Sequence, residues 1–216
     1  MAPMEPAEVA ERIGLGRLHR PAEVLKHDEP FPVWRFSTDS GEWVVKATRP
    51  WGDFWLGVAA QAGLLEAAAW RAGVPTAEPL IPEACETGLW QPIGDGVYAH
   101  AVRFHQGEHP EPPVADALAT WAGATVAAIE RLDIEADPTV DADYTSHPES
   151  EWDTWLSQAR DLGVLDARQA RSLKDAAVRI DAIAAPAMAA KPRKLVMHRD
   201  FSHLNILTTA ECPLLI

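Results

Sequence analysis

The chain has 216 residues, of which 47% are hydrophobic, and carries a formal net charge of −13. This composition predicts one large folded domain or two small lobes, and it argues against a disordered chain. A chain this acidic, with no basic stripe, repels phosphate backbones, so nucleic acid is not an expected partner and a cationic small molecule fits better.

The first hundred residues predict strands around one helix. Residues 4–16 predict a short helix stopped by glycines. Residues 33–48 predict a β-hairpin, because two alternating runs flank an Asp-Ser-Gly turn. Residues 53–73 are rich in Ala and Leu at helical spacing and end at a glycine, which predicts a helix with a defined stop. Two further strands are expected at 87–93 and 96–104.

A polar, proline-rich joint follows at 105–113 and is the best position for a lobe boundary. A long helix is expected at 114–132. Residues 133–153 are acidic, contain prolines and show no periodicity, so we expect a loop there.

Two more helices are expected at 154–165 and 166–186, with Asp166 as the N-cap of the second. Three short strands then follow, at 194–198, 205–209 and 213–216. The whole order predicts an α+β, two-lobed fold, with an N-terminal lobe over 1–104 and a C-terminal lobe over 105–216.

Cysteine usage and the N-terminus favour the cytoplasm. Cys85 and Cys212 lie far apart without metal-ligand spacing, which argues against zinc and disulfides. The N-terminus carries acids where a signal peptide needs bases. No stretch reaches the ~18 apolar residues of a membrane span, so no membrane partner is expected.

The stretch His198-Arg199-Asp200 ends five residues before Asn205, which is the only asparagine in the chain. An aspartate at the apex of a loop between two strands can accept the proton of an attacking hydroxyl, and an asparagine five residues later can offer its amide oxygen to Mg²⁺. This is the spacing of kinase catalytic loops. His198 is expected to hold the loop in place. The alternative is a loop with a capping Asp and a turn Asn.

Lys46 and Glu66 form a second candidate pair. Lys46 lies in the middle of a strand, on the face opposite Trp43 and Val45, and Glu66 lies among alanines and leucines of the following helix. A buried lysine is costly without a partner, and pairing the two would satisfy both and aim Lys46 at nucleotide phosphates. Taken singly, Lys46 could be an edge-strand lysine and Glu66 part of a solvated helix face.

Together these residues resemble the aminoglycoside phosphotransferase family, which includes choline- and homoserine-kinase-like enzymes and shares the protein-kinase-like fold. The resemblance covers about residues 20–216. The motifs that carry it are Lys46, Glu66, the joint near 104–107, and His198, Asp200 and Asn205.

The resemblance implies an ATP-dependent enzyme with Mg²⁺. It implies that Asp200 is the catalytic base, that Asn205 is a metal ligand, and that Lys46 contacts ATP phosphates while Glu66 holds Lys46. The backbone near Phe104 and His105 would then pair with adenine.

Three departures from the family pattern bear on activity. No glycine falls between Arg17 and Ser40, so no glycine-rich flap covers the phosphates. Ser202 stands where many such kinases carry His. The family's second metal-binding Asp follows an apolar strand like that ending at Ile216, so we expect the chain to be a fragment, truncated within its second lobe and weakly active or inactive as given.

The acceptor is expected to be a small, amino-bearing molecule with a hydroxyl. Nine acids against one Arg lie between Glu130 and Asp153, and a carboxylate-rich wall suits ammonium groups. Substrate-binding candidates from this segment are Asp143, Glu151 and Asp153. A solvated acidic loop is the alternative interpretation of the segment. Trp152 and Trp155 could add cation–π contacts to the acceptor, and core packing is the alternative for them.

Two functions of different class therefore stand. The first is a small-molecule kinase that transfers the γ-phosphoryl group of ATP. The alternative is a catalytically impaired kinase-fold protein that binds a nucleotide or other ligand. A kinase acting on proteins is disfavoured, because the sequence shows no A-P-E segment.

Overall fold

A computed structural model gives the fold of most of the chain. It describes residues 5–27, 31–50, 52–83, 88–140, 149–190, 193–198 and 200–216. The chain forms two compact units, one from Met1–Val140 with Leu195–Ile216 and the other from Asp141–Lys194. The expected lobe boundary between residues 104 and 105 falls inside the first unit and stays a prediction.

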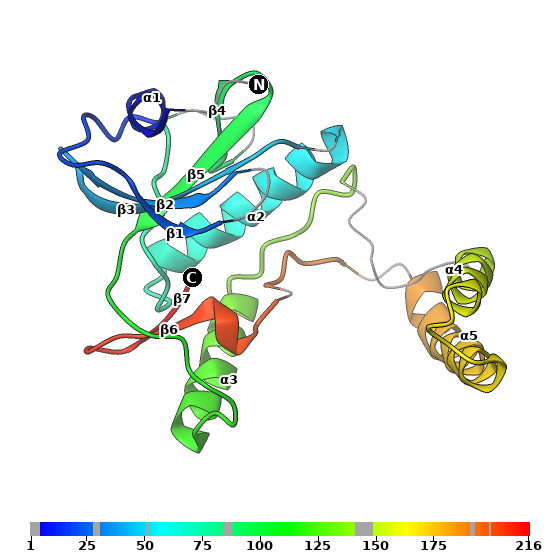
Figure 1. Cartoon of the computed structure of the whole chain (residues 1–216). Helices are drawn as coiled ribbons and strands as arrows, with labels where there is room; N and C mark the ends of the chain where they lie inside the picture. The colour runs from blue at the N-terminus through cyan, green and yellow to red at the C-terminus, as the bar shows by residue number, and fades with distance from the viewer. Residues whose placement is uncertain are drawn as a thin grey trace. The chain divides into compact units, whose positions relative to one another are not determined.

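The first unit is built on a five-stranded antiparallel sheet (Figure 1) with the strand order β1-β2-β3-β5-β4. The strands are β1 (Glu23–Lys26), β2 (Val33–Thr38), β3 (Gly41–Thr48), β4 (Gln91–Gly94) and β5 (Val97–Arg103). β2 and β3 form the expected hairpin, with Thr38 opposite Gly41. β5 pairs with β3 so that His100 lies opposite Lys46.

One face of this sheet carries the first hydrophobic core. Side chains alternate across a strand, and every second residue of β2, including Phe36, is buried. Phe36 and Val45 have no exposed surface and pack with alternate residues of β5. Helix α1 (Pro6–Arg12) covers this face with Val9 and Ala10.

Helix α2 (Asp53–Arg71) lies along the sheet, as Figure 1 shows. It ends where the glycine predicted: Gly73 adopts a positive φ of 75° and its N–H donates to the carbonyl of Trp70. Glu66 of α2 contacts His100 of β5, so α2 packs on the face opposite the first core.

A second hydrophobic core joins α2 to the end of the chain. Its buried members are Leu65, Ala69, Val74, Ile129 and Leu215. Ile129 comes from helix α3 (Asp116–Glu130), and Leu215 comes from strand β7 (Pro213–Leu215), which pairs with β6 (Ile206–Thr208). The backbone of Leu215 also bonds to Pro75 and Ala77, which fixes the β6–β7 hairpin against the segment after α2.

The second unit contains the helix pair α4 (Glu149–Asp161) and α5 (Ala167–Ala189). The expected N-cap of α5 is confirmed, because Oδ1 of Asp166 accepts the N–H groups of Arg168 and Gln169 at 2.7 Å each. Oε1 of Gln169 in turn accepts a hydrogen bond from the Asp166 N–H, which completes a capping box.

Two expectations about elements are wrong, and one strand was not predicted. Residues 149–153 are helical rather than loop: they form the start of α4, on which Trp152 and Trp155, three residues apart, meet edge-on. Residues 194–198 do not form a strand: Leu195 makes one isolated bridge with Glu135, and Val196 is partly buried against the second core. β1 was not expected, because all four of its residues are exposed and give no alternation. In the described part of the chain, no helix is long and apolar enough to cross a membrane.

Candidate functional site

The structure brings Asp200 and Asn205 together. Asn205 ends a single 3-10 turn, η1 (His203–Asn205), directly before β6. Its Nδ2 donates to the backbone carbonyl of Asp200 at 2.7 Å and to Asp200 Oδ2 at 3.0 Å. Ile216 donates to the Asn205 carbonyl at 2.9 Å, so the hairpin of β6 and β7 supports the loop from behind.

These bonds leave two oxygens of the loop available. Because Nδ2 of Asn205 faces Asp200, its amide oxygen faces the other way, and Oδ1 of the exposed Asp200 carboxylate has no partner in the described structure. Mg²⁺ in phosphoryl-transfer sites is bound by one or two protein oxygens together with phosphates and waters. The donor set at Asn205 therefore fits one ligand of such an ion.

His198 packs at the base of this loop. Its ring meets Phe201 edge-on, with centroids 5.4 Å apart, and Nδ1 is buried without a hydrogen-bond partner in the described part of the chain. Burial lowers the pKa of the imidazole below its usual 6.5, and the charges of Asp200 and Glu66 partly oppose this. The contact favours a packing role for His198, and its expected role in the catalytic loop stays a prediction.

Lys46 and Glu66 do not form the ion pair expected from the sequence. Glu66 Oε2 instead lies 3.2 Å from Nε2 of His100, a distance typical of an ion pair, although the ring N–H is not aligned for a hydrogen bond. Lys46 is exposed rather than buried, and no carboxylate of the described residues lies within ion-pair distance of it. Exposure removes the need for a neutralising partner, which is why the burial argument fails.

Lys46 nevertheless faces the same side of the sheet as Glu66. Lys46 and His100 are direct cross-strand partners, and side chains of such pairs share one face with their Cβ atoms about 5 Å apart. The structure therefore places Lys46 beside the residue that contacts Glu66, without joining the two.

The segment after β5 leaves fewer backbone groups available for pairing with adenine than expected. The N–H of Phe104 already donates to the carbonyl of Glu42 at 3.0 Å, and the guanidinium of Arg35 lies 3.8 Å from the centre of the Phe104 ring. The backbone of His105 makes no hydrogen bond within the described residues. Of the two residues, His105 keeps its N–H available for a base, whereas Phe104 does not.

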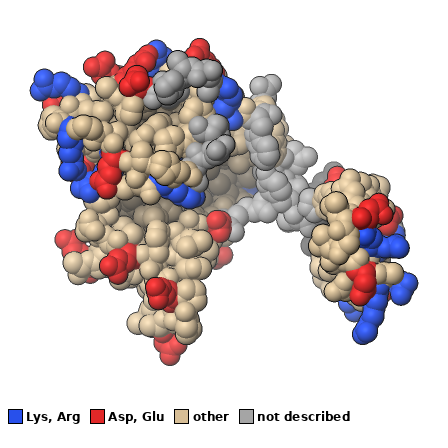
Figure 2. Space-filling model, viewed as in Figure 1, with Lys and Arg blue, Asp and Glu red and all other residues tan. Residues whose placement is uncertain are grey.

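The acidic acceptor residues belong mainly to the second unit. Asp143 lies outside the described residues. Glu151 and Asp153 are exposed on α4, and Asp153 Oδ1 is engaged by Nζ of Lys174 at 2.6 Å. On the face shown in Figure 2, acidic and basic side chains are interspersed on this helix pair. Their role in binding an acceptor stays a prediction.

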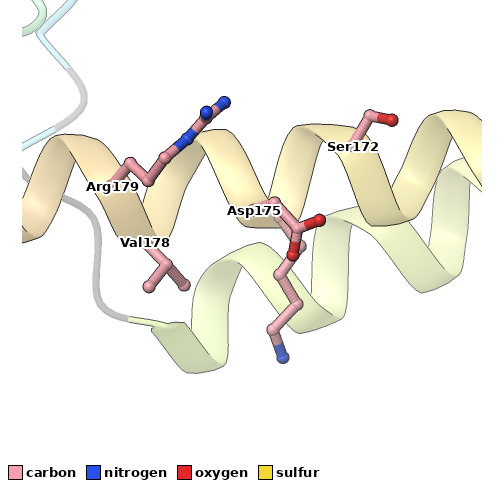
Figure 3. Close-up of a pocket in the computed structure, with 5 residues that line it drawn as sticks. Ser172, Asp175, Val178 and Arg179 are labelled. Carbon is pink, nitrogen blue, oxygen red and sulfur yellow. The ribbon is translucent and has the colours of Figure 1, made fainter.

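A surface hollow on α5 does not coincide with any of these residues. It is lined by Ser172, Lys174, Asp175, Val178 and Arg179. Figure 3 shows Arg179 and Ser172 extending to one side of the helix and Val178 to the other. A hollow lined by a single helix cannot surround a ligand, so we assign it no function.

Reasoning from the sequence missed one residue of the site, His100. His100 lies on the same face of the sheet as Lys46, which would have indicated its place beside the site. This shared face follows only from the pairing of β5 with β3, which the sequence does not show.

Comparison with known proteins agrees with this fold. The structure resembles that of spectinomycin phosphotransferase, APH(9)-Ia, solved in complex with ADP and spectinomycin, with a TM-score of 0.56, 12% identity and 93% of this chain covered. It also resembles an aminoglycoside phosphotransferase from Alicyclobacillus acidocaldarius subsp. acidocaldarius DSM 446, with a TM-score of 0.56, 16% identity and 100% of this chain covered. The chain spans 64% and 66% of the lengths of these two proteins. These likenesses confirm the expected α+β, protein-kinase-like fold class.

No curated protein matches the chain. A model of the phosphotransferase enzyme family matches residues 22–216. This range includes the sheet, α2 and the loop of Asp200 and Asn205, and it confirms the family resemblance. The chain therefore belongs to the phosphotransferase enzyme family.

Proposed function

We propose that this protein is an ATP-dependent phosphotransferase that moves the γ-phosphoryl group to a hydroxyl of a small, amino-bearing molecule of aminoglycoside type. The observation that carries the proposal is the pair of hydrogen bonds from Asn205 Nδ2 to Asp200. They hold the carboxylate of Asp200 next to the side-chain amide of Asn205, and phosphoryl transfer uses such a base together with a nearby metal ligand.

In this proposal Asp200 accepts the proton of the acceptor hydroxyl as the oxygen attacks. Oδ2 of Asp200 is fixed by Asn205, so Oδ1 is the oxygen left to receive the proton. Asn205 would hold Mg²⁺ through its amide oxygen. The ion neutralises charge on the phosphates when bound.

The nucleotide would lie between this loop and the sheet face of Lys46. Lys46 would contact the phosphates, and its exposed side chain leaves the ammonium group available for them. His105 would pair with adenine, because its backbone is not otherwise engaged. ADP in the spectinomycin phosphotransferase complex is consistent with a nucleotide in this fold.

The acceptor proposal rests on charge. A formal charge of −13 attracts amines, and the first two structural relatives are named for aminoglycosides or spectinomycin. Glu151 and Asp153 are the two described candidates, and Asp153 already pairs with Lys174.

A second candidate function is nucleotide or ligand binding without catalysis. The missing ion pair between Lys46 and Glu66 favours it, because a kinase aligns its phosphate-binding lysine through that carboxylate. The absence of glycine between Arg17 and Ser40 points the same way.

Replacing Asp200 by Asn tests the proposal. Removing a general base lowers turnover by about 10²–10⁴-fold. ADP binding should change little, because in this proposal Asp200 contacts the protein and the acceptor rather than the nucleotide. Turnover is measured as ADP release with Mg²⁺, ATP and a panel of aminoglycosides, choline and homoserine.

Asp116→Asn is the matched control, since Asp116 is an exposed carboxylate at the start of α3 and should leave turnover unchanged. Undiminished phosphorylation by Asp200→Asn would remove Asp200 from the base role. ADP binding by the wild-type chain without any turnover would favour the second candidate.

A further inference from the structure

His100 is a mostly buried histidine that lies against Glu66. Its side chain is 11% exposed, and its Nε2 is buried 3.2 Å from Oε2 of Glu66 without hydrogen-bond geometry. A buried polar nitrogen without a bond is costly, so its persistence calls for a reason. The nitrogen lies close to a carboxylate that the family's chemistry assigns to a lysine.

The register of the sheet places both candidate partners of Glu66 side by side. Lys46 of β3 and His100 of β5 are opposite each other on one face, and Glu66 approaches that face from α2. One oxygen of the carboxylate, Oε2, lies against His100. The other oxygen makes no contact with a charged group of the described residues, so a single carboxylate can serve both neighbours.

Aromatic rings fix the imidazole in this orientation. The ring of Trp90 lies 5.2 Å from that of His100 at 33°, and Trp55 meets Trp90 edge-on at 5.1 Å. Trp55 belongs to α2, the helix that carries Glu66. The stack therefore ties the histidine to the same helix as the carboxylate that it faces.

Glu66 also lies close enough to the catalytic loop for its charge to raise the pKa of His198 against the effect of burial. Phe201 of the loop packs against the second core, to which Leu65, the neighbour of Glu66 on α2, belongs, so the carboxylate is located near both β5 and the loop of Asp200. Its orientation affects both the lysine side and the loop side of the proposed nucleotide site.

We infer that His100 is a positioning residue of the nucleotide site, which holds Oε2 of Glu66 so that the second carboxylate oxygen is presented to Lys46. The inference rests on the proposed function. His100 touches neither nucleotide nor acceptor and acts through Glu66. An imidazole with its proton on Nε2 donates to Oε2 after a small rotation of the Glu66 carboxylate, and such contacts are often poorly aligned before the ligand binds.

The test compares two amides at position 100. His100→Gln places an N–H donor near the position of Nε2, whereas His100→Asn is one carbon shorter and cannot reach Glu66. Both are neutral and polar, so the difference between them reports the contact rather than burial or charge. ADP with Mg²⁺ is titrated calorimetrically into each full-length variant, and thermal unfolding confirms that each is folded.

His100→Asn should weaken ADP binding about tenfold, the size expected for loss of one bond to a charged group, and His100→Gln should stay within about threefold of the wild type. In a Glu66→Ala background the difference between the two variants should fall below about twofold, because the residue through which His100 acts is gone. A packing role for His100 would persist in that background. His19→Asn, at an exposed histidine paired with Asp39, is the matched control and should bind ADP as the wild type does.

Three results would overturn the inference while leaving the phosphotransferase proposal intact. They are equal ADP binding by the two variants, tighter ADP binding by His100→Asn than by the wild type, and an undiminished difference between the two variants in the Glu66→Ala background. Tighter binding would show that His100 competes with Lys46 for Glu66. Failure of the wild-type chain to bind ADP at millimolar concentration would instead overturn the proposed function, and the inference with it.

Discussion

Gly107 lies where the segment after β5 passes the backbone of β6, and replacing it by Ala should destabilise the first unit. A Cβ at this position would lie 2.6 Å from the carbonyl oxygen of Thr208 and 2.8 Å from Cγ of Leu207. Ordinary contacts begin at 3.4 Å, and the oxygen belongs to backbone that cannot rotate away. The two segments must therefore separate.

The expected cost follows from what holds the segments together. Glu108 and Thr208 exchange two backbone hydrogen bonds, of 3.1 and 2.8 Å, and His109 Nδ1 lies 3.0 Å from the carbonyl of Ile206. Overpacking costs about 1–3 kcal/mol, and each strained or lost hydrogen bond costs about 1 kcal/mol. Ala also lowers the conformational entropy of the unfolded chain, which offsets this cost by about 0.4–1 kcal/mol. We expect Gly107→Ala to lower the free energy of unfolding by about 2–4 kcal/mol.

Urea unfolding followed by far-UV circular dichroism measures this change. The midpoint should fall by on the order of 1 M with an unchanged slope. Gly123→Ala provides the control, because Gly123 is an exposed residue of α3 and its Cβ would meet nothing within 4 Å. That variant should gain up to about 1 kcal/mol from helix propensity.

An equal or higher midpoint for Gly107→Ala would refute the reasoning, since it would mean that the contact between the two segments yields without cost. The result bears on function as well. Thr208 lies three residues after Asn205, so the same contact helps to fix the loop that carries the proposed metal ligand.

Two further predictions concern local groups. Asp166→Ala removes both hydrogen bonds at the start of α5 and should destabilise the helix pair of the second unit by about 0.5–2 kcal/mol. Asp166→Ser should retain most of the cap. Thermal unfolding compares the two variants, and an equal loss of stability in both would contradict the capping role. His198 should titrate below 6.5 in the folded protein, because burial disfavours its cation. The imidazole of His198 therefore has a higher pKa in the unfolded chain than in the folded protein. The contribution of the neutral ring to the free energy of unfolding is complete above pH 6.5 and is lost as the pH falls through the pKa of the folded state. A ring-proton NMR titration with a midpoint at or above 6.5 would show that the imidazole is not desolvated.

Local chemistry could be predicted wherever it depends on neighbours in the sequence. Asp200 and Asn205 are five residues apart in a loop too short for other partners, and the structure joins them directly. The cap at Asp166 likewise involves only the next three residues. The hairpin of β2 and β3 follows from the alternation of its strands and the turn between them.

Single elements without a local signal could not be predicted. The exposed strand β1 exists because β2 offers a free edge, and its own residues show no buried pattern. Residues 194–198 are apolar enough for a strand, but among the described residues Leu195 forms a single bridge, with Glu135 from a segment sixty residues earlier. Whether an extended run becomes a strand depends on such distant neighbours.

The sequence by itself determined the family, the order of the main elements and the loop that carries Asp200, because periodicity, caps and short spacings act within a few residues. The partner of Glu66 was decided only by the tertiary structure. Lys46 and His100 become neighbours through the pairing of two strands 54 residues apart, and α2 brings Glu66 to His100 rather than to Lys46. A charged side chain contacts the groups that packing places within reach, and no local pattern encodes which distant strand that will be.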